Sequence, residues 1–238
     1  MIDELARALA DSLGLDPGPI GIMYSEEPAP GSFRPKYACV GIKHAFRGKT
    51  VTLSRENLVC PGGIHWLGFM DLEEILVAFL VMFEQSFSDS DVARRWFRSC
   101  PVPRFGRAEY VVLGPLDVFE EKPDLVAAMC TPVQAEALQS LLTFSRGDHV
   151  TSQRFCATCQ GVITNALAQP SLTIPDEFSR KVARFPEDLM IFSMPYEFAV
   201  EAARNVEVWK VDMDDIFRRV VEITRGGGGA AGARDGEP

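Results

Sequence analysis

Six cysteines and three histidines are the residues of this 238-residue chain whose types could do nucleophilic or metal chemistry. Cys60 precedes a Pro-Gly-Gly turn at the predicted start of a helix. Backbone N–H groups and the helix dipole would stabilise a thiolate at such a position. Cys39 and Cys156 have comparable positions, at or near a predicted helix start after a loop. Thiolates in these positions suit metal ligation or nucleophilic attack.

Cys156 and Cys159 form a Cys-x-x-Cys sequence, which puts two sulfurs within one helical turn. This spacing suits a dithiol redox pair or two metal ligands. The sequence has no second Cys-x-x-Cys to complete a zinc ribbon, and Gln160 stands where covalent haem attachment needs histidine. Cys130, inside an apolar run, is predicted to be structural, and Cys100, which precedes a proline, suits a cluster-binding loop or a helix end equally well.

Apolar periodicity and end signals predict the elements that position these residues. Helices are predicted at residues 2–13, 39–46, 64 onward, 71–87, 89–98, 132–142, 156–167, 197–206 and 213–224. Strands are predicted at residues 19–24, 50–53, 108–113, 124–130 and 189–193. This interleaving predicts a single layered α/β or α+β domain over residues 1–224, with a mixed sheet and packed helices. The Gly-rich tail, residues 225–238, is predicted to be disordered.

Composition excludes several classes of protein. The chain has 24 Lys and Arg against 33 Asp and Glu, which argues against nucleic acid as a partner. The most apolar run, residues 75–83, is far shorter than the roughly 20 residues of a membrane span. The N-terminus lacks the pattern of a secretory signal. The sequence therefore predicts a cytoplasmic protein without a membrane partner, and leaves its oligomeric state open.

Motifs along most of the chain resemble those of the domain of unknown function 169 family of bacteria and archaea. They include Pro19-Ile-Gly-Ile22, Cys39 with Ala45, Cys60-Pro-Gly-Gly63, Leu67-Gly-Phe69, Thr131-Pro-Val-Gln134, Cys156-Ala157 and Ser179-Arg180. The resemblance implies that the recurrent cysteines of the family fall on Cys39, Cys60 and Cys156. Cys100, Cys130 and Cys159 then look like additions of this sequence. The resemblance implies a shared fold and a short set of residues, but no activity.

The first functional hypothesis is a cysteine-ligated iron–sulfur or metal-binding protein, with Cys39, Cys60, Cys156 and Cys159 as ligands. A [4Fe–4S] cluster held fully by protein needs four cysteines, so three thiolates would leave one position open for a small ligand or electron transfer. Cys159 would instead close that position. A small molecule or a redox protein is the partner compatible with such a site.

Two alternatives remain open. One is a metal-free thiol enzyme in which Cys60 is the reactive thiolate, resolved by Cys39 or by the Cys156/Cys159 pair. The other is a non-catalytic module for a small anion, with Arg180 as the donor to a carboxylate or phosphate. Gln134, one turn into a predicted helix, would be a polar contact of that ligand. A surface salt bridge for Arg180 and helix capping for Gln134 would explain these residues equally well.

Overall fold

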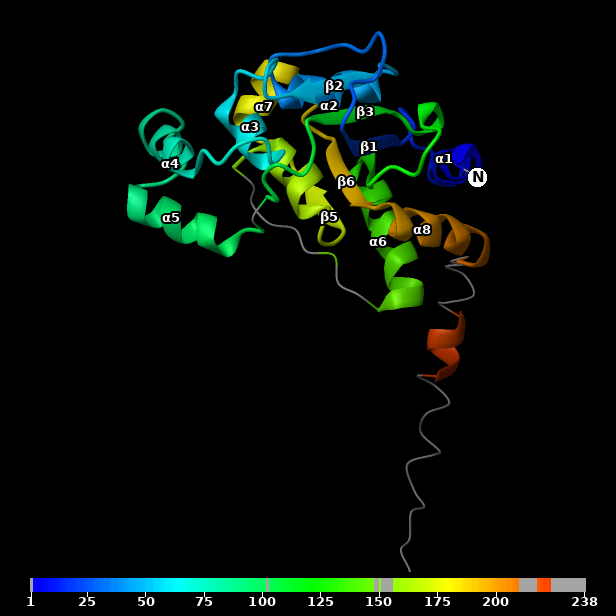
Figure 1. Ribbon diagram of the computed structural model, residues 1–238. Helices are drawn as coiled ribbons and strands as arrows, with labels where there is room; N and C mark the ends of the chain where they lie inside the picture. The colour runs from blue at the N-terminus through cyan, green and yellow to red at the C-terminus, as the bar shows by residue number, and fades with distance from the viewer. Residues whose placement is uncertain (1, 102, 148–149, 151–155, 210–217, 224–238) are drawn as a thin grey trace, which may run out of the picture.

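Figure 1 shows the computed structural model, which describes residues 2–101, 103–147, 150, 156–209 and 218–223. Six strands form one sheet in the order β2-β3-β1-β4-β6-β5. They are β1 (Ile20–Ser25), β2 (Val51–Ser54), β3 (Tyr110–Pro115), β4 (Leu125–Cys130), β5 (Ser171–Thr173) and β6 (Met190–Pro195). The α+β class is as predicted, but every strand pairing is antiparallel, where a mixed sheet was expected.

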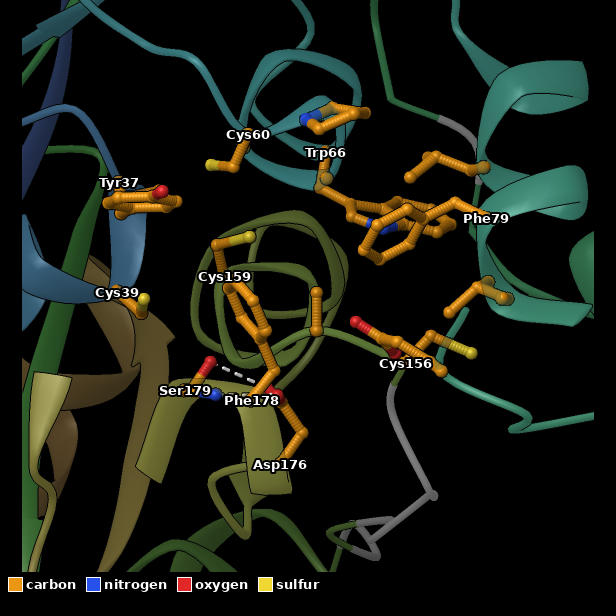
Figure 2. Close-up of a pocket in the computed structure, with 18 of the residues that line it drawn as sticks. Tyr37, Cys39, Cys60, Trp66, Phe79, Cys156, Cys159, Asp176, Phe178 and Ser179 are labelled. Atoms are coloured by element: carbon orange, nitrogen blue, oxygen red, sulfur yellow. Dashed lines mark hydrogen bonds between the residues drawn. The ribbon is translucent and has the colours of Figure 1, made fainter. Parts of the chain in front are cut away.

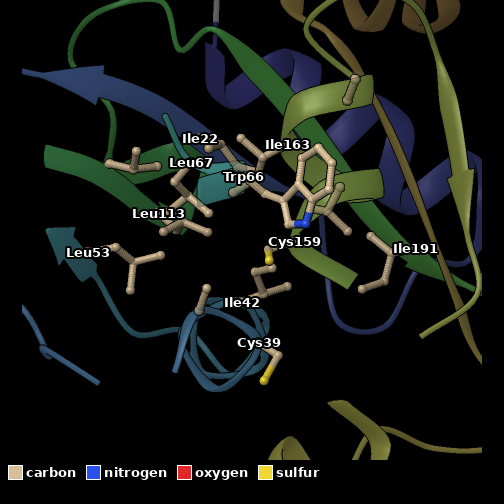
Figure 3. Close-up of a cluster of buried hydrophobic side chains, with 14 of the residues drawn as sticks. Ile22, Cys39, Ile42, Leu53, Trp66, Leu67, Leu113, Cys159, Ile163 and Ile191 are labelled. Atoms are coloured by element: carbon tan, nitrogen blue, oxygen red, sulfur yellow. The ribbon is translucent and has the colours of Figure 1, made fainter. Parts of the chain in front are cut away.

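One face of the sheet carries the layer that contains the cysteines. Ile22, Leu125 and Ile191 point to this face and pack in one buried cluster with residues of α2 (Ala38–Phe46) and α3 (Pro61–Trp66). Figure 3 shows part of this cluster, with Cys39 and Cys159 among its side chains. Successive residues of a strand point to opposite faces of the sheet, so the residues next to these three along each strand point to the other face.

The other face of the sheet is covered by three helices, α1 (Ile2–Leu13), α6 (Pro132–Arg146) and α8 (Tyr196–Val208). Val126, Phe192 and Met194 point to this face and pack in a second buried cluster with these helices. The helices on the two faces shield both sides of the sheet from water. The sheet that packs against the cysteine layer is therefore packed on its opposite face against a second apolar layer.

Helices α4 (Glu73–Met82) and α5 (Ser90–Ser99) pack against each other at one side of the molecule (Figure 1). Helix α5 lies close to the predicted range of residues 89–98, and Asp89 caps it, since its carboxylate accepts a hydrogen bond of 2.9 Å from the Val92 N–H. The helix predicted over residues 71–87 is shorter in the structure. It ends at Met82, and Gln85 turns the chain with a φ of 52°.

The helix predicted over residues 156–167 is present over residues 158–165, but it is not a regular α-helix. Residues 158–159 are α-helical, and η2 (Gln160–Asn165) is a π-helix with all of its residues buried. The structure also contains α7 (Glu177–Ala183) and the short 3₁₀-helix η1 (Leu116–Val118), neither of which was predicted.

Two predictions at the C-terminus fall largely outside the described residues. Residues 218–223 are helical, in agreement with part of the helix predicted over 213–224. The tail predicted to be disordered, residues 225–238, lies outside the residues that the structure describes. In the described parts of the chain, no helix combines the length and the apolar character needed to cross a membrane.

Candidate functional site

A cavity of about 300 Å³ lies where α2, α3, α4 and α7 meet beside η2 (Figure 2). Cys39, Cys60, Cys156 and Cys159 all line it. They come from three separate segments of the chain: α2, the start of α3 and the residues that precede η2. The fold therefore brings all four cysteines with predicted ligand roles to the same cavity.

Cys39 is the second residue of α2, and its side chain is only 6% exposed. Burial raises the pKa of its thiol to about 12, although a hydrogen bond with the side chain of Ser179 partly opposes this shift. A charge on Cys60 would raise the pKa of Cys39 further, which places the two thiols within electrostatic range of each other. In the structure as it stands, Cys39 is a protonated thiol at neutral pH.

Cys60 is the N-cap residue of α3, and the absence of a side chain at Gly63 makes room for its thiol. A Cβ atom on Gly63 would lie 2.7 Å from the Cys60 Sγ and 3.1 Å from the Ala38 Cβ. The Cys60 thiol therefore lies over Gly63, close to the first turn of α2. A Cβ on Gly62 would lie 3.7 Å from the Ala157 Cβ, so α3 also approaches the Cys-x-x-Cys segment.

Cys159, rather than Cys156, lies within electrostatic range of Cys39 and Cys60. Burial raises the pKa of the Cys159 thiol, and charges on Cys60 and Cys39 would raise it further. Figure 2 shows Cys39, Cys60 and Cys159 on one side of the pocket and Cys156 on the opposite side. The resemblance had implied Cys39, Cys60 and Cys156 as the recurrent set.

Asp176 was missed in the sequence, although it holds the Cys-x-x-Cys segment in place. Its Oδ2 accepts hydrogen bonds from the Thr158 N–H at 2.7 Å and from the Thr158 hydroxyl at 2.8 Å. Its Oδ1 accepts one from the Ser179 N–H at 2.8 Å, which caps α7. The signal was present, because Asp is a preferred N-cap residue and an acidic residue, Glu177, follows it in the first turn.

The rest of the cavity wall is mainly aromatic and aliphatic, with two carboxylates. Tyr37, Trp66, Phe79 and Phe178 supply the rings (Figure 2), and none of the lining residues that the structure describes is basic. Glu84 also lines the cavity, and burial, with a smaller contribution from the charge of Asp176, raises its pKa to about 7. Among the residues that the structure describes, the cavity wall is thus mainly apolar and has no cationic side chain.

The two predicted ligand donors lie elsewhere and bond to backbone carbonyls. Arg180 donates from Nε to the Pro175 carbonyl at 2.9 Å and from Nη1 to the Pro186 carbonyl at 2.8 Å. It thereby braces the segments on both sides of α7.

Gln134 forms a capping box with Thr131 at the start of α6 and donates to the carbonyls of Leu13 and Gly14. Neither Gln134 nor Arg180 lines the cysteine cavity. Their roles as ligand contacts remain predictions.

The remaining cysteines lie outside the cavity. Cys130 ends β4 and is fully buried on the far face of the sheet. Cys100 follows α5, where its thiol donates to the Trp96 carbonyl at 3.4 Å. Both fill apolar space, as free cysteines commonly do.

The cavity is not a ready-formed metal site. Within the described residues, no group of three or more His, Cys, Asp and Glu side chains is arranged to hold a metal ion. The thiols share a cavity, and a metal would have to draw them closer together.

The family model described as Uncharacterised ArCR, domain of unknown function 169, matches residues 8–205 of the chain. This match spans the cavity and both faces of the sheet. No curated protein and no solved structure shows significant similarity to the chain.

Proposed function

The chain belongs to the domain of unknown function 169 family, and from that premise we propose that it is a cysteine-ligated iron–sulfur or metal-binding protein. One observation carries the proposal: Cys39, Cys60, Cys156 and Cys159, which are spread over three segments, line one cavity. Free cysteines that only fill apolar space have no reason to meet at one cavity.

The electrostatics of the cavity support a metal in preference to a free thiolate. Burial raises the pKa of Cys39 to about 12 and also raises that of Cys159, and none of the described lining residues is basic. A thiolate there would have no cationic partner within the wall. A bound metal deprotonates its thiol ligands outright, so it would supply the positive charge that the described lining residues lack.

The donor set suits soft metals and iron–sulfur clusters, for which thiolate is the preferred protein ligand. Cys39, Cys60 and Cys159 would be three ligands, with Cys156 as the fourth from across the cavity. If Cys156 did not reach the metal, one position would remain without a cysteine ligand. The aromatic wall of the cavity, which includes Trp66 and Phe79, would limit the access of water.

Anaerobic reconstitution with ferrous iron and sulfide tests the proposal. We expect the wild-type protein to retain iron after desalting and to gain visible charge-transfer absorption. We expect Cys39→Ala, Cys60→Ala and Cys159→Ala to lose most of the bound iron. Cys130→Ala is the matched control, because Cys130 is buried outside the cavity, and it should load like wild type.

Two outcomes would contradict the proposal. The first is a wild-type protein that holds neither iron nor zinc after anaerobic preparation. The second is equal loading of the cavity variants and of Cys130→Ala. Circular dichroism of each variant separates loss of the metal from loss of the fold.

The exposure of Cys60 supports a second candidate, the metal-free thiol enzyme. Cys60 is partly exposed, whereas Cys39 and Cys159 are buried within electrostatic range of it. A peroxide oxidant would convert the Cys60 thiolate to a sulfenic acid, and one of the buried thiols would then displace water from it to form a disulfide. Mass spectrometry after mild oxidation of the metal-free protein would then find Cys60 linked to Cys39 or Cys159. Alkylation of Cys60 no faster than that of a simple thiol would argue against this candidate.

The anion-binding alternative has less support at this cavity. Its wall contains Glu84 and Asp176 and, among the described residues, no basic side chain. A negatively charged ligand would be repelled by both carboxylates and would lose its hydration in an apolar pocket.

A further inference from the structure

Trp66 lines a second cavity, of about 200 Å³, as well as the cysteine cavity. Its wall comes from the loop that contains Pro103 and Arg107, from β1 and from the end of η2. Two arginines, Arg104 and Arg107, line it, whereas the described wall of the cysteine cavity has none. The two cavities therefore offer opposite charge on either side of a shared tryptophan.

The guanidinium of Arg107 is held in a fixed position. It lies over the ring of Tyr24, with its central carbon 4.2 Å from the ring centroid. It also forms an ion pair with Asp124, whose second oxygen accepts a hydrogen bond of 2.8 Å from the Tyr24 N–H. Stacking and ion pairing fix the plane of the guanidinium before any ligand arrives, which lowers the entropy cost of binding.

Arg104 supplies a positive charge that no described residue neutralises. Its side chain makes no ion pair or hydrogen bond with any residue in the described part of the chain. Its backbone is nevertheless anchored. Gly68 has a φ of 82°, and a Cβ there would lie 2.7 Å from the Arg104 carbonyl oxygen. The Gly106 N–H also donates to the Gly68 carbonyl at 2.9 Å, so the loop is tied to the end of α3.

The rest of the wall is largely apolar and includes Trp66, Pro103 and Leu167. The volume of about 200 Å³ is below the roughly 300–1,000 Å³ of sites for drug-sized ligands. A ligand that fits must be small, must have an apolar body and must carry a group that pairs with guanidinium. A planar carboxylate is such a group, because it matches the two N–H donors of an arginine.

We propose that this second cavity binds a small organic carboxylate, with its charge at Arg104 and Arg107 and its apolar body against Trp66 and Leu167. The proposal does not depend on a metal in the cysteine cavity. It assigns the anion-binding role to the arginines of the loop after α5, instead of to Arg180.

Calorimetric titration of the full-length protein with benzoate tests the proposal. We expect saturable binding of benzoate by the wild-type protein and no measurable binding of benzyl alcohol, its neutral counterpart. Arg104→Gln should weaken benzoate binding about tenfold to a hundredfold, the range expected for loss of a charged hydrogen-bond partner. Arg98→Gln is the matched control, since Arg98 is exposed on α5 and does not line the cavity.

A second variant locates the site independently of charge. Ala168 is exposed and lines the cavity, so Ala168→Trp should fill the cavity and abolish benzoate binding without changing the fold. Equal benzoate affinity of wild type, Arg104→Gln and Ala168→Trp would overturn the proposal. Binding of inorganic phosphate as tightly as benzoate would also overturn it, because the apolar wall would then contribute nothing. Cys60→Ala should bind benzoate like wild type, so a failure of the metal proposal is distinguishable from a failure here.

Discussion

Asp176 accepts hydrogen bonds from both the backbone N–H and the hydroxyl of Thr158, the residue that immediately precedes Cys159. The same carboxylate accepts hydrogen bonds from the N–H and the hydroxyl of Ser179 in α7. One side chain therefore connects the Cys-x-x-Cys segment to the helix that brings Ser179 to Cys39. The positions of two cavity thiols depend on it.

We expect Asp176→Ala to lower the free energy of unfolding by about 2–4 kcal/mol, because it removes a helix cap and the hydrogen bonds of a charged acceptor. Urea denaturation measures this change. Asp188→Ala, at an exposed position, is the control and should stay within about 0.5 kcal/mol of wild type. An equal effect of the two substitutions would show that the Thr158 contacts contribute nothing.

Alanine substitutions at the two glycines of α3 should differ in their effect on the position of the Cys60 thiol. Gly63→Ala places a Cβ 2.7 Å from the Cys60 Sγ, so it must displace the thiol. Gly62→Ala makes only an ordinary contact of 3.7 Å with Ala157 and gains up to about 1 kcal/mol of helix propensity.

We therefore expect Gly63→Ala, but not Gly62→Ala, to reduce iron retention after reconstitution, by about tenfold. Thermal unfolding of both variants provides the stability comparison. Full retention of iron by Gly63→Ala would argue against Cys60 as a ligand.

Because the Cys39 thiol is buried, the free energy of unfolding of the metal-free protein should fall in alkaline solution. Its pKa is 9.0 in an ordinary environment and about 12 in the fold, so above pH 9 the unfolded thiol ionises first. The stabilising contribution is complete below pH 9 and is lost as the pH rises toward 12, at about 1.4 kcal/mol per pH unit.

Between pH 9 and pH 11, wild type should therefore lose about 2–3 kcal/mol more than Cys39→Ala does. Denaturant unfolding at each pH measures the difference. Parallel curves for the two proteins would show that the Cys39 thiol is not buried as described.

Glu84 should destabilise the fold as its carboxyl group ionises. Its pKa is raised from 4.5 to about 7 by burial and by Asp176, so its contribution is present below pH 4.5 and is lost as the pH rises through 7. Because the side chain is half-buried, solvent screening reduces the effect.

We expect Glu84→Gln to be about 1 kcal/mol more stable than wild type at pH 8, after allowance for that screening, and to show no gain at pH 4. Thermal unfolding at the two pH values checks this expectation. Glu56→Gln, at an exposed position, controls for the change of net charge.

Elements with strong local signals could be predicted from the sequence. The helix over residues 2–13 is confirmed, because its leucines recur at helical spacing and Gly14 follows with a φ of 61°. The helix predicted over residues 89–98 is confirmed as α5, and the carboxylate of its N-cap, Asp89, accepts a hydrogen bond from the Val92 N–H. In these cases the residues that predict the helix from the sequence are also residues that stabilise it in the structure.

Elements that depend on tertiary contacts could not be predicted in this way. Strand β5 has three residues, and its pairing with β6 and its packing against η2 hold it in place. Residues 156–167 have a helical pattern, but only residues 158–159 are α-helical, and Gln160–Asn165 form a buried π-helix that packs against α3, β5 and β6. Local propensity is weak enough for packing to override it.

The candidate site was predictable in part. Loop-to-helix positions singled out Cys39, Cys60 and Cys156, and all three line the cavity. The sequence alone could not show that Cys159, instead of Cys156, lies within electrostatic range of Cys39 and Cys60, because this depends on the path of the chain into η2. The contributions of Asp176, Glu84 and the aromatic wall depend on contacts between distant segments.

The π-helical form of η2 affects how the cysteines that precede it are oriented toward the cavity. A π-turn contains one more residue than an α-turn, and η2 follows Cys159 directly. If the same residues formed an α-helix instead, the preceding cysteines would be rotated by about 100°, the angle of one residue, relative to the residues that follow. The side of the chain that Cys159 presents to the cavity therefore depends on the π-helical turn as well as on the residues that line the cavity.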